Sequence, residues 1–147
     1  MKIGLIACSK TKLGKDNPEQ KFKAKDIYQG NTFKIAKNSG IQKYNCDDYS
    51  ILSAKYGLLY KDKEISYYDS YLGNKSASFK KAWAEIVLEQ LKALYDLEKD
   101  VFYIFGGKEY YENLIQHLHC FVFSYKNSNT INLDDVTEYC YGVKQNG

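Results

Sequence analysis

The sequence contains no arginine, and all 21 of its cationic side chains are lysines. Bidentate guanidinium recognition of a base or a carboxylate is therefore excluded, and phosphate can be held only by lysine or by backbone N–H groups. No apolar run approaches the ~20 residues that span a bilayer, so we expect no membrane partner. The formal net charge of +3 is too small to demand a nucleic acid partner.

The charge is nevertheless uneven along the chain. Residues 1–45 hold ten lysines against three acidic residues, which gives +7, whereas residues 46–147 carry −4. A basic front half favours an anionic ligand. A solvated lysine-rich loop explains the same pattern.

Metal-binding spacing is also absent. No C-x-x-C pair occurs, and we expect the only histidines, His117 and His119, to close a helix with no third ligand nearby. The sequence therefore predicts no metal site and no cofactor. The four cysteines are too sparse for a disulfide scaffold and read as free thiols in a reducing cytoplasm: Cys8, Cys46, Cys120 and Cys140.

Export is an alternative raised by LIAC at residues 5–8, which matches the cleavage pattern of a bacterial lipoprotein. The apolar stretch before Cys8 runs only from Ile3 to Ala7, and a secretory signal needs about 7–15 apolar residues. We therefore expect a cytoplasmic protein.

Short apolar runs alternate with helical patterns. This alternation predicts a single α/β domain over residues 1–147, with a mainly parallel sheet of four to five strands flanked by helices. Residues 13–25 read as a polar loop. The expected strands are 2–8, 49–54, 101–105, 120–125 and an edge strand at 137–143; the expected helices are 31–39, ending near Gly40, 76–97, capped by Ser76 or Ser78, and 108–118.

The candidate site follows from where these strands end. Ligands of open α/β sheets bind outside the carboxyl ends of the strands. Three such ends each carry a lysine, with hydroxyl residues or glycines beside it. The residues expected to bind ligand there are Ser9, Lys10, Thr11, Lys12, Ser53, Lys55, Tyr56, Gly57, Gly106 and Gly107.

The lysines would neutralise phosphate, and the helix expected after Gly107 would offer free N–H groups to an anion. Tyr28 would form a wall of the pocket or belong to the core, and Tyr68 would contact a base or sugar. Asp69 lies between tyrosines and would contact a base or sugar, or act as a general base; a turn cap is the plain alternative. The patterns G-x-x-x-x-G-K-[ST] and G-x-G-x-x-G are both missing, so neither a P-loop nor a dinucleotide site is expected.

Several motifs in order resemble a family of small bacterial and phage proteins of unknown function. They are C-S-K-x-K at 8–12, D-x-Y at 26–28, ILSAKYGLL at 51–59, I-x-x-Y-D-x-x-L at 65–72, Trp83-Ala84 and G-x-x-Y at 107–110. The matched part covers about residues 2–114, and the part from 120 to 147 lies outside it. That family is similar in turn to the YaaA peroxide-stress family, which implies DNA binding, although the arginines of the YaaA motifs are replaced here by Tyr60 and Asp69. The start of the chain also faintly resembles the uracil-DNA-glycosylase-like domain of archaeal tRNA-base-exchange enzymes.

Three functions remain open from the sequence. The first is binding of a nucleotide, free or within a nucleic acid, at the lysine, serine and tyrosine pocket. The second is an enzyme that cleaves or transfers at an N-glycosidic bond, with Asp69 stabilising positive charge on the sugar. The third is a non-catalytic bacterial or phage factor that sequesters a host molecule.

Overall fold

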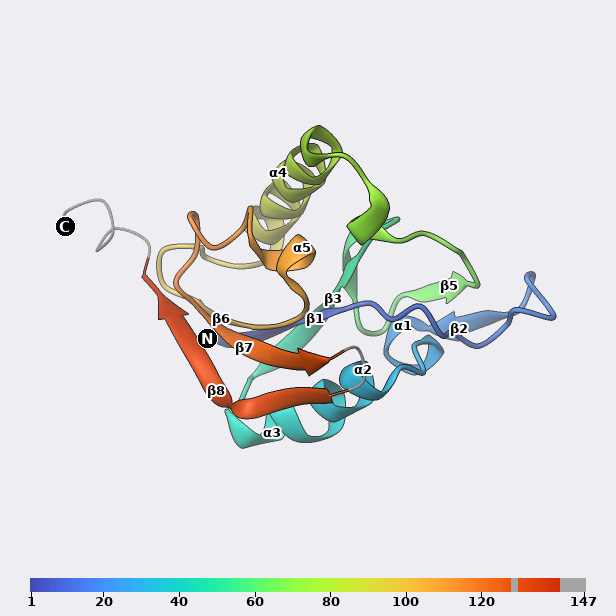
Figure 1. Cartoon of the computed structure of the whole chain (residues 1–147), viewed down its shortest axis with the longest axis horizontal. Helices are drawn as coiled ribbons and strands as arrows, with labels where there is room; N and C mark the ends of the chain where they lie inside the picture. Colours follow the sequence, from blue (N-terminus) through green and yellow to red (C-terminus); the bar gives the residue numbers. More distant parts are fainter. Residues whose placement is uncertain (128–129, 141–147) are drawn as a thin grey trace.

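The computed structural model describes residues 1–127 and 130–140, and a six-stranded mixed sheet forms its centre (Figure 1). The strand order is β4-β3-β1-β6-β7-β8. A second sheet contains only β2 and β5. The strands are β1 (Lys2–Ala7), β2 (Lys21–Lys23), β3 (Asp48–Ser53), β4 (Gly57–Tyr60), β5 (Glu64–Ser66), β6 (Val101–Phe105), β7 (Cys120–Asn127) and β8 (Thr130–Tyr139).

The inner four strands, β3, β1, β6 and β7, are parallel, and β4 and β8 add antiparallel edges. The predicted α/β class and mainly parallel core are confirmed, with a sheet larger than expected. The helical segments are α1 (Ala24–Ile27), α2 (Asn31–Ile35), the π-helix η1 (Ala36–Gly40), α3 (Ile41–Lys43), the 3-10 helix η2 (Leu72–Asn74), α4 (Ala77–Leu94) and α5 (Lys108–Tyr111).

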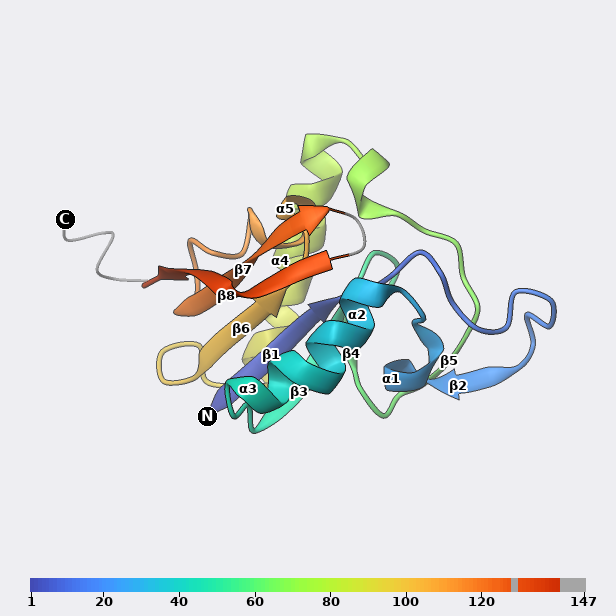
Figure 2. The same ribbon diagram turned by 60° about the horizontal axis from the view of Figure 1, so that its bottom comes forward.

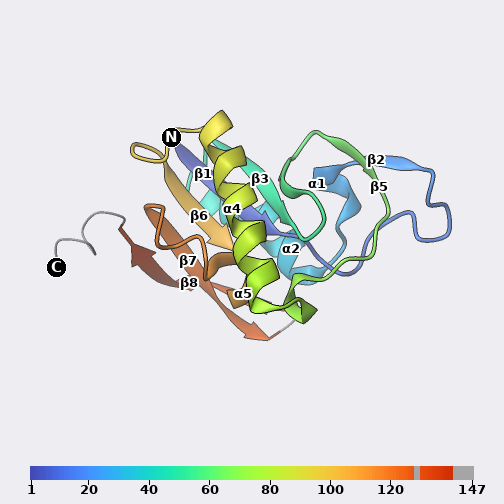
Figure 3. The same cartoon turned by 90° about the horizontal axis from the view of Figure 1, so that it is seen from above.

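Helices cover both faces of this sheet. In Figures 1 and 3, α4 and α5 lie over one face, while Figure 2 shows α2 and α3 along the other. Strand β1 supplies both cores, because its side chains alternate: Leu5 packs with Trp83 and Val87, and Ile6 packs with Phe33. These residues are almost fully buried, as expected for a central parallel strand.

The order of the strands creates a reversal at β1. The chain passes from β1 to β3 by α2 and α3 on one face, then returns across β1 to β6 by α4 on the other. In such sheets, ligands usually bind in the crevice between two neighbouring strands whose outgoing connections run in opposite directions along the sheet. Here those strands are β1 and β6, whose carboxyl ends lie side by side.

The helix expected at 31–39 does not end near Gly40. Helical structure continues through η1 and α3, and the backbone leaves it at Asn45, which has a positive φ of 54°. Gly40 serves packing instead, because a Cβ at this position would lie 2.6 Å from the ring of Phe105 on β6. The glycine allows the helix to approach the sheet closely.

The long helix is confirmed, with Ser76 as its N-cap: the Ser76 hydroxyl accepts a hydrogen bond from the Phe79 amide at 3.1 Å. Apolar residues recur along this helix at three- and four-residue steps, but the stripe is only partly buried, since Phe79 and Ile86 are exposed. The helix expected at 108–118 ends at Tyr111 and continues as turns.

Residues 21–25 of the predicted polar loop lie instead in β2 and in the first half of α1. The predicted edge strand at 137–143 begins earlier, at Thr130, and its residues 141–143 lie outside the described part of the chain. No helix in the described residues is both long and apolar enough to cross a bilayer.

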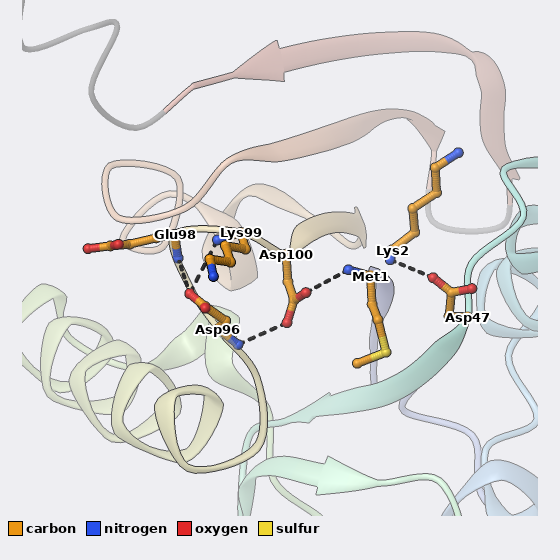
Figure 4. Close-up of polar contacts among 7 residues, drawn as sticks. All are labelled: Met1, Lys2, Asp47, Asp96, Glu98, Lys99 and Asp100. Carbon is orange, nitrogen blue, oxygen red and sulfur yellow. Dashed lines mark hydrogen bonds and ion pairs between the residues drawn. The ribbon is translucent and has the colours of Figure 1, made fainter.

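The amino end of β1 is fixed by charge (Figure 4). The Met1 ammonium donates to the Asp100 carboxylate at 2.6 Å, and the other carboxylate oxygen of Asp100 accepts from the Asp96 amide at 2.8 Å. The Lys2 amide of β1 donates at 2.8 Å to the side chain of Asp47, which directly precedes the neighbouring strand β3. The Asp100 side chain is only 9% exposed. These bonds hold the pKa of Asp100 below its usual value.

We predict that Asp100→Asn lowers the free energy of unfolding by about 1–2 kcal/mol at neutral pH, because a hydrogen bond to a charged group is lost. A lowered carboxyl pKa contributes stability that is present above the unfolded value of about 3.9 and is lost as the pH falls through the folded value. Urea unfolding at neutral and acidic pH should therefore show the two proteins converging in acid. Glu98→Gln, which removes a charge from an exposed side chain, is the control; an equal loss there would contradict the assignment.

Candidate functional site

The segment after β1 is held close to the sheet by its own polar groups. The Cys8 amide donates to the Leu52 carbonyl at 2.9 Å, which extends the pairing with β3. The Ser9 hydroxyl accepts from the Gly30 amide at 3.1 Å and donates to the Thr11 carbonyl at 2.8 Å. Ser9 therefore shapes the turn, whereas the side chain of Lys10 is exposed to solvent, as is that of Thr11.

Lys12 turns back into the protein. Its backbone forms an isolated antiparallel β-bridge with that of Tyr28, and only 8% of the residue's surface is exposed. Its ammonium group lies 4.5 Å from the centroid of the Tyr68 ring, 5.8 Å from that of Tyr67 and 6.0 Å from that of Tyr28. The ammonium donates one hydrogen bond within the described chain, to the Lys10 carbonyl at 3.2 Å. The aromatic faces replace part of the water that the charge has lost.

Tyr68 joins the neighbouring strand ends. Its hydroxyl lies 2.6 Å from that of Tyr28 and 2.9 Å from that of Ser53. The Ser53 hydroxyl also accepts from the amides of Lys55 and Tyr56, at 3.2 and 3.0 Å. Burial raises the pKa of both Tyr28 and Tyr68, so both phenols are neutral hydrogen-bonding groups at physiological pH.

The second strand end is a hairpin turn from β3 into β4. Gly57 has a positive φ of 73°, which favours glycine there. Gln90 of α4 fixes the turn, since it accepts from the Leu58 amide at 2.7 Å and donates to the Tyr56 carbonyl at 3.2 Å. The Trp83 indole N–H donates to the Ser53 carbonyl at 2.8 Å.

This turn presents two side chains to solvent. The Lys55 ammonium lies 5.1 Å from the Tyr56 centroid and 5.8 Å from the Tyr68 centroid. Tyr56 is 36% exposed and meets Tyr68 edge to face at 5.5 Å. We call the combined set the Lys–Tyr cluster: Lys12, Tyr28, Ser53, Lys55, Tyr56 and Tyr68.

The third strand end differs from expectation. Neither Gly106 nor Gly107 has a positive φ, and α5 is too short to provide an N-terminal anion site. Gly106 serves close packing, because a Cβ there would lie 2.8 Å from that of Ala7 on β1. Both glycines line a hollow of about 360 Å³ with Lys108 and residues of β7 and β8. None of its lining residues belongs to the Lys–Tyr cluster.

Cys8 connects the two regions. Its sulfur lies 3.3 Å from the Tyr110 hydroxyl of α5. It also lies close enough to Lys12 and Tyr68 to influence their ionisation. The Cys8 side chain is half-buried.

The cluster carries excess positive charge. Burial lowers the pKa of Lys12, which nearby Cys8 and Asp69 raise in part. Within the described residues, neither Lys12 nor Lys55 has a carboxylate oxygen within 4.0 Å. Asp69 itself is exposed. Two ammonium groups therefore lie beside one tyrosine ring without a direct acidic partner.

The sequence identified most of the cluster but missed its supports. Gln90 lies at helical spacing among the apolar residues of 76–97, and a polar residue in such a position can signal a hydrogen-bonding role. The tie between Cys8 and Tyr110 has no local sequence pattern, since it joins residues far apart in the chain.

The expectation for the histidines is wrong. They follow α5 in turns and do not close a helix. His119 lies with Glu138 and Cys140, and the potential ligand atoms of these three residues are all within 4.8 Å of one another. All four cysteines are free thiols in the structure.

Comparison with known protein families identifies one family that matches this chain. A model described as a family of unknown function, DUF6884, matches residues 3–128. The chain belongs to this family. The match covers the entire Lys–Tyr cluster and ends one residue after β7 of this DUF6884 fold. No curated protein and no solved structure gives a significant match.

We predict that Tyr68→Phe destabilises this DUF6884 protein by about 1–3 kcal/mol, because two buried hydroxyl groups lose their shared partner. The aromatic ring and its contacts with both lysines remain. Urea unfolding measures the effect, and Tyr71→Phe is the matched control because Tyr71 is 51% exposed. Equal stability of the Tyr68→Phe variant and the native protein would show that the network contributes nothing.

Proposed function

We propose that the chain binds a nucleotide, free or as part of a nucleic acid, at the Lys–Tyr cluster. One observation carries the proposal: Lys12 and Lys55, from adjacent strand ends, both lie beside the Tyr68 ring, at 4.5 and 5.8 Å, without an acidic partner within ion-pair distance in the described chain. An anion beside this ring would compensate both charges.

The neighbouring groups favour a nucleotide over a simple anion. Lys10 and Thr11 extend from the adjacent turn into solvent and would add charge and a hydroxyl donor. Tyr56 offers a partly exposed aromatic surface next to Lys55, and stacking on such surfaces is a common way to hold a base without sequence preference. Phosphate charge and base surface would thus be recognised by different parts of one site.

The YaaA-like motifs support the nucleic acid form of this ligand. The ILSAKYGLL block supplies Ser53, Lys55 and Tyr56, so the most specific part of the resemblance forms part of the cluster. Lysine without arginine suits contact with phosphate more than readout of bases. A short single strand or a free nucleotide fits these groups better than a duplex site with sequence specificity.

We predict that Lys55→Ala weakens binding of a nucleotide or short single-stranded oligonucleotide at least about tenfold, and lowers the salt slope of binding by about one for an oligonucleotide. Thermal shift identifies the ligand first: at 100 times its Kd it adds about 2.7 kcal/mol of stability. Anisotropy titrations then compare the variants.

Lys92→Ala is the control, because Lys92 is exposed on α4 and pairs only with Glu89 in the described chain. Absence of a thermal shift with nucleotides and with single-stranded DNA and RNA would contradict the proposal. Release of a free base from a bound nucleotide would instead show that the protein is an enzyme that cleaves the N-glycosidic bond.

We also predict opposite effects for Lys12→Met on stability and binding. Removing a buried, incompletely solvated charge should leave the ligand-free protein as stable or more stable, since methionine fills a similar volume. The same change should weaken nucleotide binding at least about tenfold. Urea unfolding without ligand and anisotropy with ligand test the pair of effects. Loss of stability without loss of affinity would assign Lys12 a purely structural role.

A further inference from the structure

A second cluster lies on β7 and β8, outside the Lys–Tyr cluster. We propose that His119, Glu138 and Cys140 bind a divalent transition-metal ion, with Zn²⁺ the best match. The three potential ligand atoms lie within 4.8 Å of one another. The proposal is independent of nucleotide binding.

The register of the hairpin explains why these side chains meet. Cys120 pairs with Tyr139, and Phe121 pairs with Glu138. One step further along the same antiparallel register places His119 opposite Cys140. Side chains two residues apart share a face, so Glu138 and Cys140 point to the side that His119 occupies.

The exposed surfaces agree with this geometry. His119 is partly exposed and its ring lies 5.8 Å from that of Phe121, two residues further on the same face. The intervening Cys120 is fully buried among the residues of the α4 core. The strand pair therefore separates a packed thiol on one face from an accessible thiol, imidazole and carboxylate on the other.

The distances suit a small ion. Zinc bonds of about 2.0–2.3 Å place tetrahedral ligand atoms about 3.3–3.8 Å apart. The His119 Nε2 and Glu138 Oε2 atoms are 2.7 Å apart, as a hydrogen bond. They need to separate by somewhat less than 1 Å to accept an ion between them, and the exposed Glu138 carboxylate can make that movement by a side-chain rotation.

The ligand types select the metal. A thiolate with an imidazole and a carboxylate favours zinc or a similar transition metal over magnesium or calcium, which prefer oxygen. Three protein ligands leave one tetrahedral position for water. The partial exposure of all three residues gives the ion a route to the site.

A surface ion pair is the competing explanation of the same contact. The His119–Glu138 pair is about as exposed as surface pairs that contribute little to stability, and Cys140 would then be an inert neighbour. The two explanations differ in one observable, which is whether the sulfur of Cys140 binds the metal.

Cobalt(II) provides the test, because a thiolate bound to it gives a near-ultraviolet charge-transfer band. The untagged, reduced and chelator-treated chain is titrated with Co²⁺ and then with Zn²⁺. We expect the band to appear with Co²⁺, to disappear as Zn²⁺ displaces it, and to be absent in Cys140→Ser. His119→Asn and Glu138→Gln should each weaken Co²⁺ binding at least about tenfold.

Two matched controls distinguish the site from other thiols and imidazoles. His117→Asn changes the neighbouring exposed histidine, and Cys46→Ser changes a half-buried thiol elsewhere; both should retain the band and the affinity. Circular dichroism confirms that each variant is folded. A native protein without the band, or a band that survives in Cys140→Ser, overturns the proposal.

Discussion

The hydrogen bond between the hydroxyls of Tyr68 and Ser53 holds the Lys–Tyr cluster together at the carboxyl end of β3. Ser53 is the last residue of β3, and Tyr68 lies in the segment after β5, so one contact of 2.9 Å fixes a long excursion of the chain onto the strand end. Tyr28 joins the same network from the segment that precedes α2. The ring held in this way is the surface beside which both lysines of the cluster lie.

The topology of β1 explains why these groups can meet at all. Because β1 pairs with β3 on one side and β6 on the other, its end is adjacent to both of theirs. The lysine-bearing segment after β1 follows the β3 side, where Tyr68 lies, and Cys8 remains in contact with Tyr110 on the β6 side. The two pairs of strand ends therefore differ. The ends of β1 and β3 carry the lysines and the aromatic surface, whereas the ends of β1 and β6 are closely packed, with Gly106 against Ala7.

Much of the fold could be predicted from periodicity, because buried parallel strands are short and continuously apolar. VFYIF at 101–105 is the strand β6 without any shift of boundary, and Ser76 is the N-cap, one of the two serines expected to cap the helix. Gly40 shows the limit of local reasoning. A glycine after a helical pattern normally ends the helix, but here the ring of Phe105, distant in sequence, requires a residue without Cβ inside it.

The same limit applies to the sites. Lysines and tyrosines at strand ends could be selected from topology alone, since parallel strands end at one edge. That Lys12 folds back under the aromatic rings while Lys10 stays in solvent depends on the bridge to Tyr28, which no spacing rule encodes. The grouping of His119 with Cys140 depends on the register of β7 and β8, and a shift of one residue would have sent one of them to the buried face.

Because the chain has no arginine, the buried cation of the Lys–Tyr cluster is a lysine, Lys12, whose ammonium group loses hydration on burial. A lysine ammonium is a compact charge that loses hydration on burial, and its pKa falls when the protein does not replace that hydration. Tyrosine faces and one carbonyl oxygen replace only part of it. An anion that reached this ammonium would therefore restore interactions that the folded chain lacks by itself. Under the proposed function, the stability that the free protein forgoes at Lys12 would become part of the affinity for the bound nucleotide.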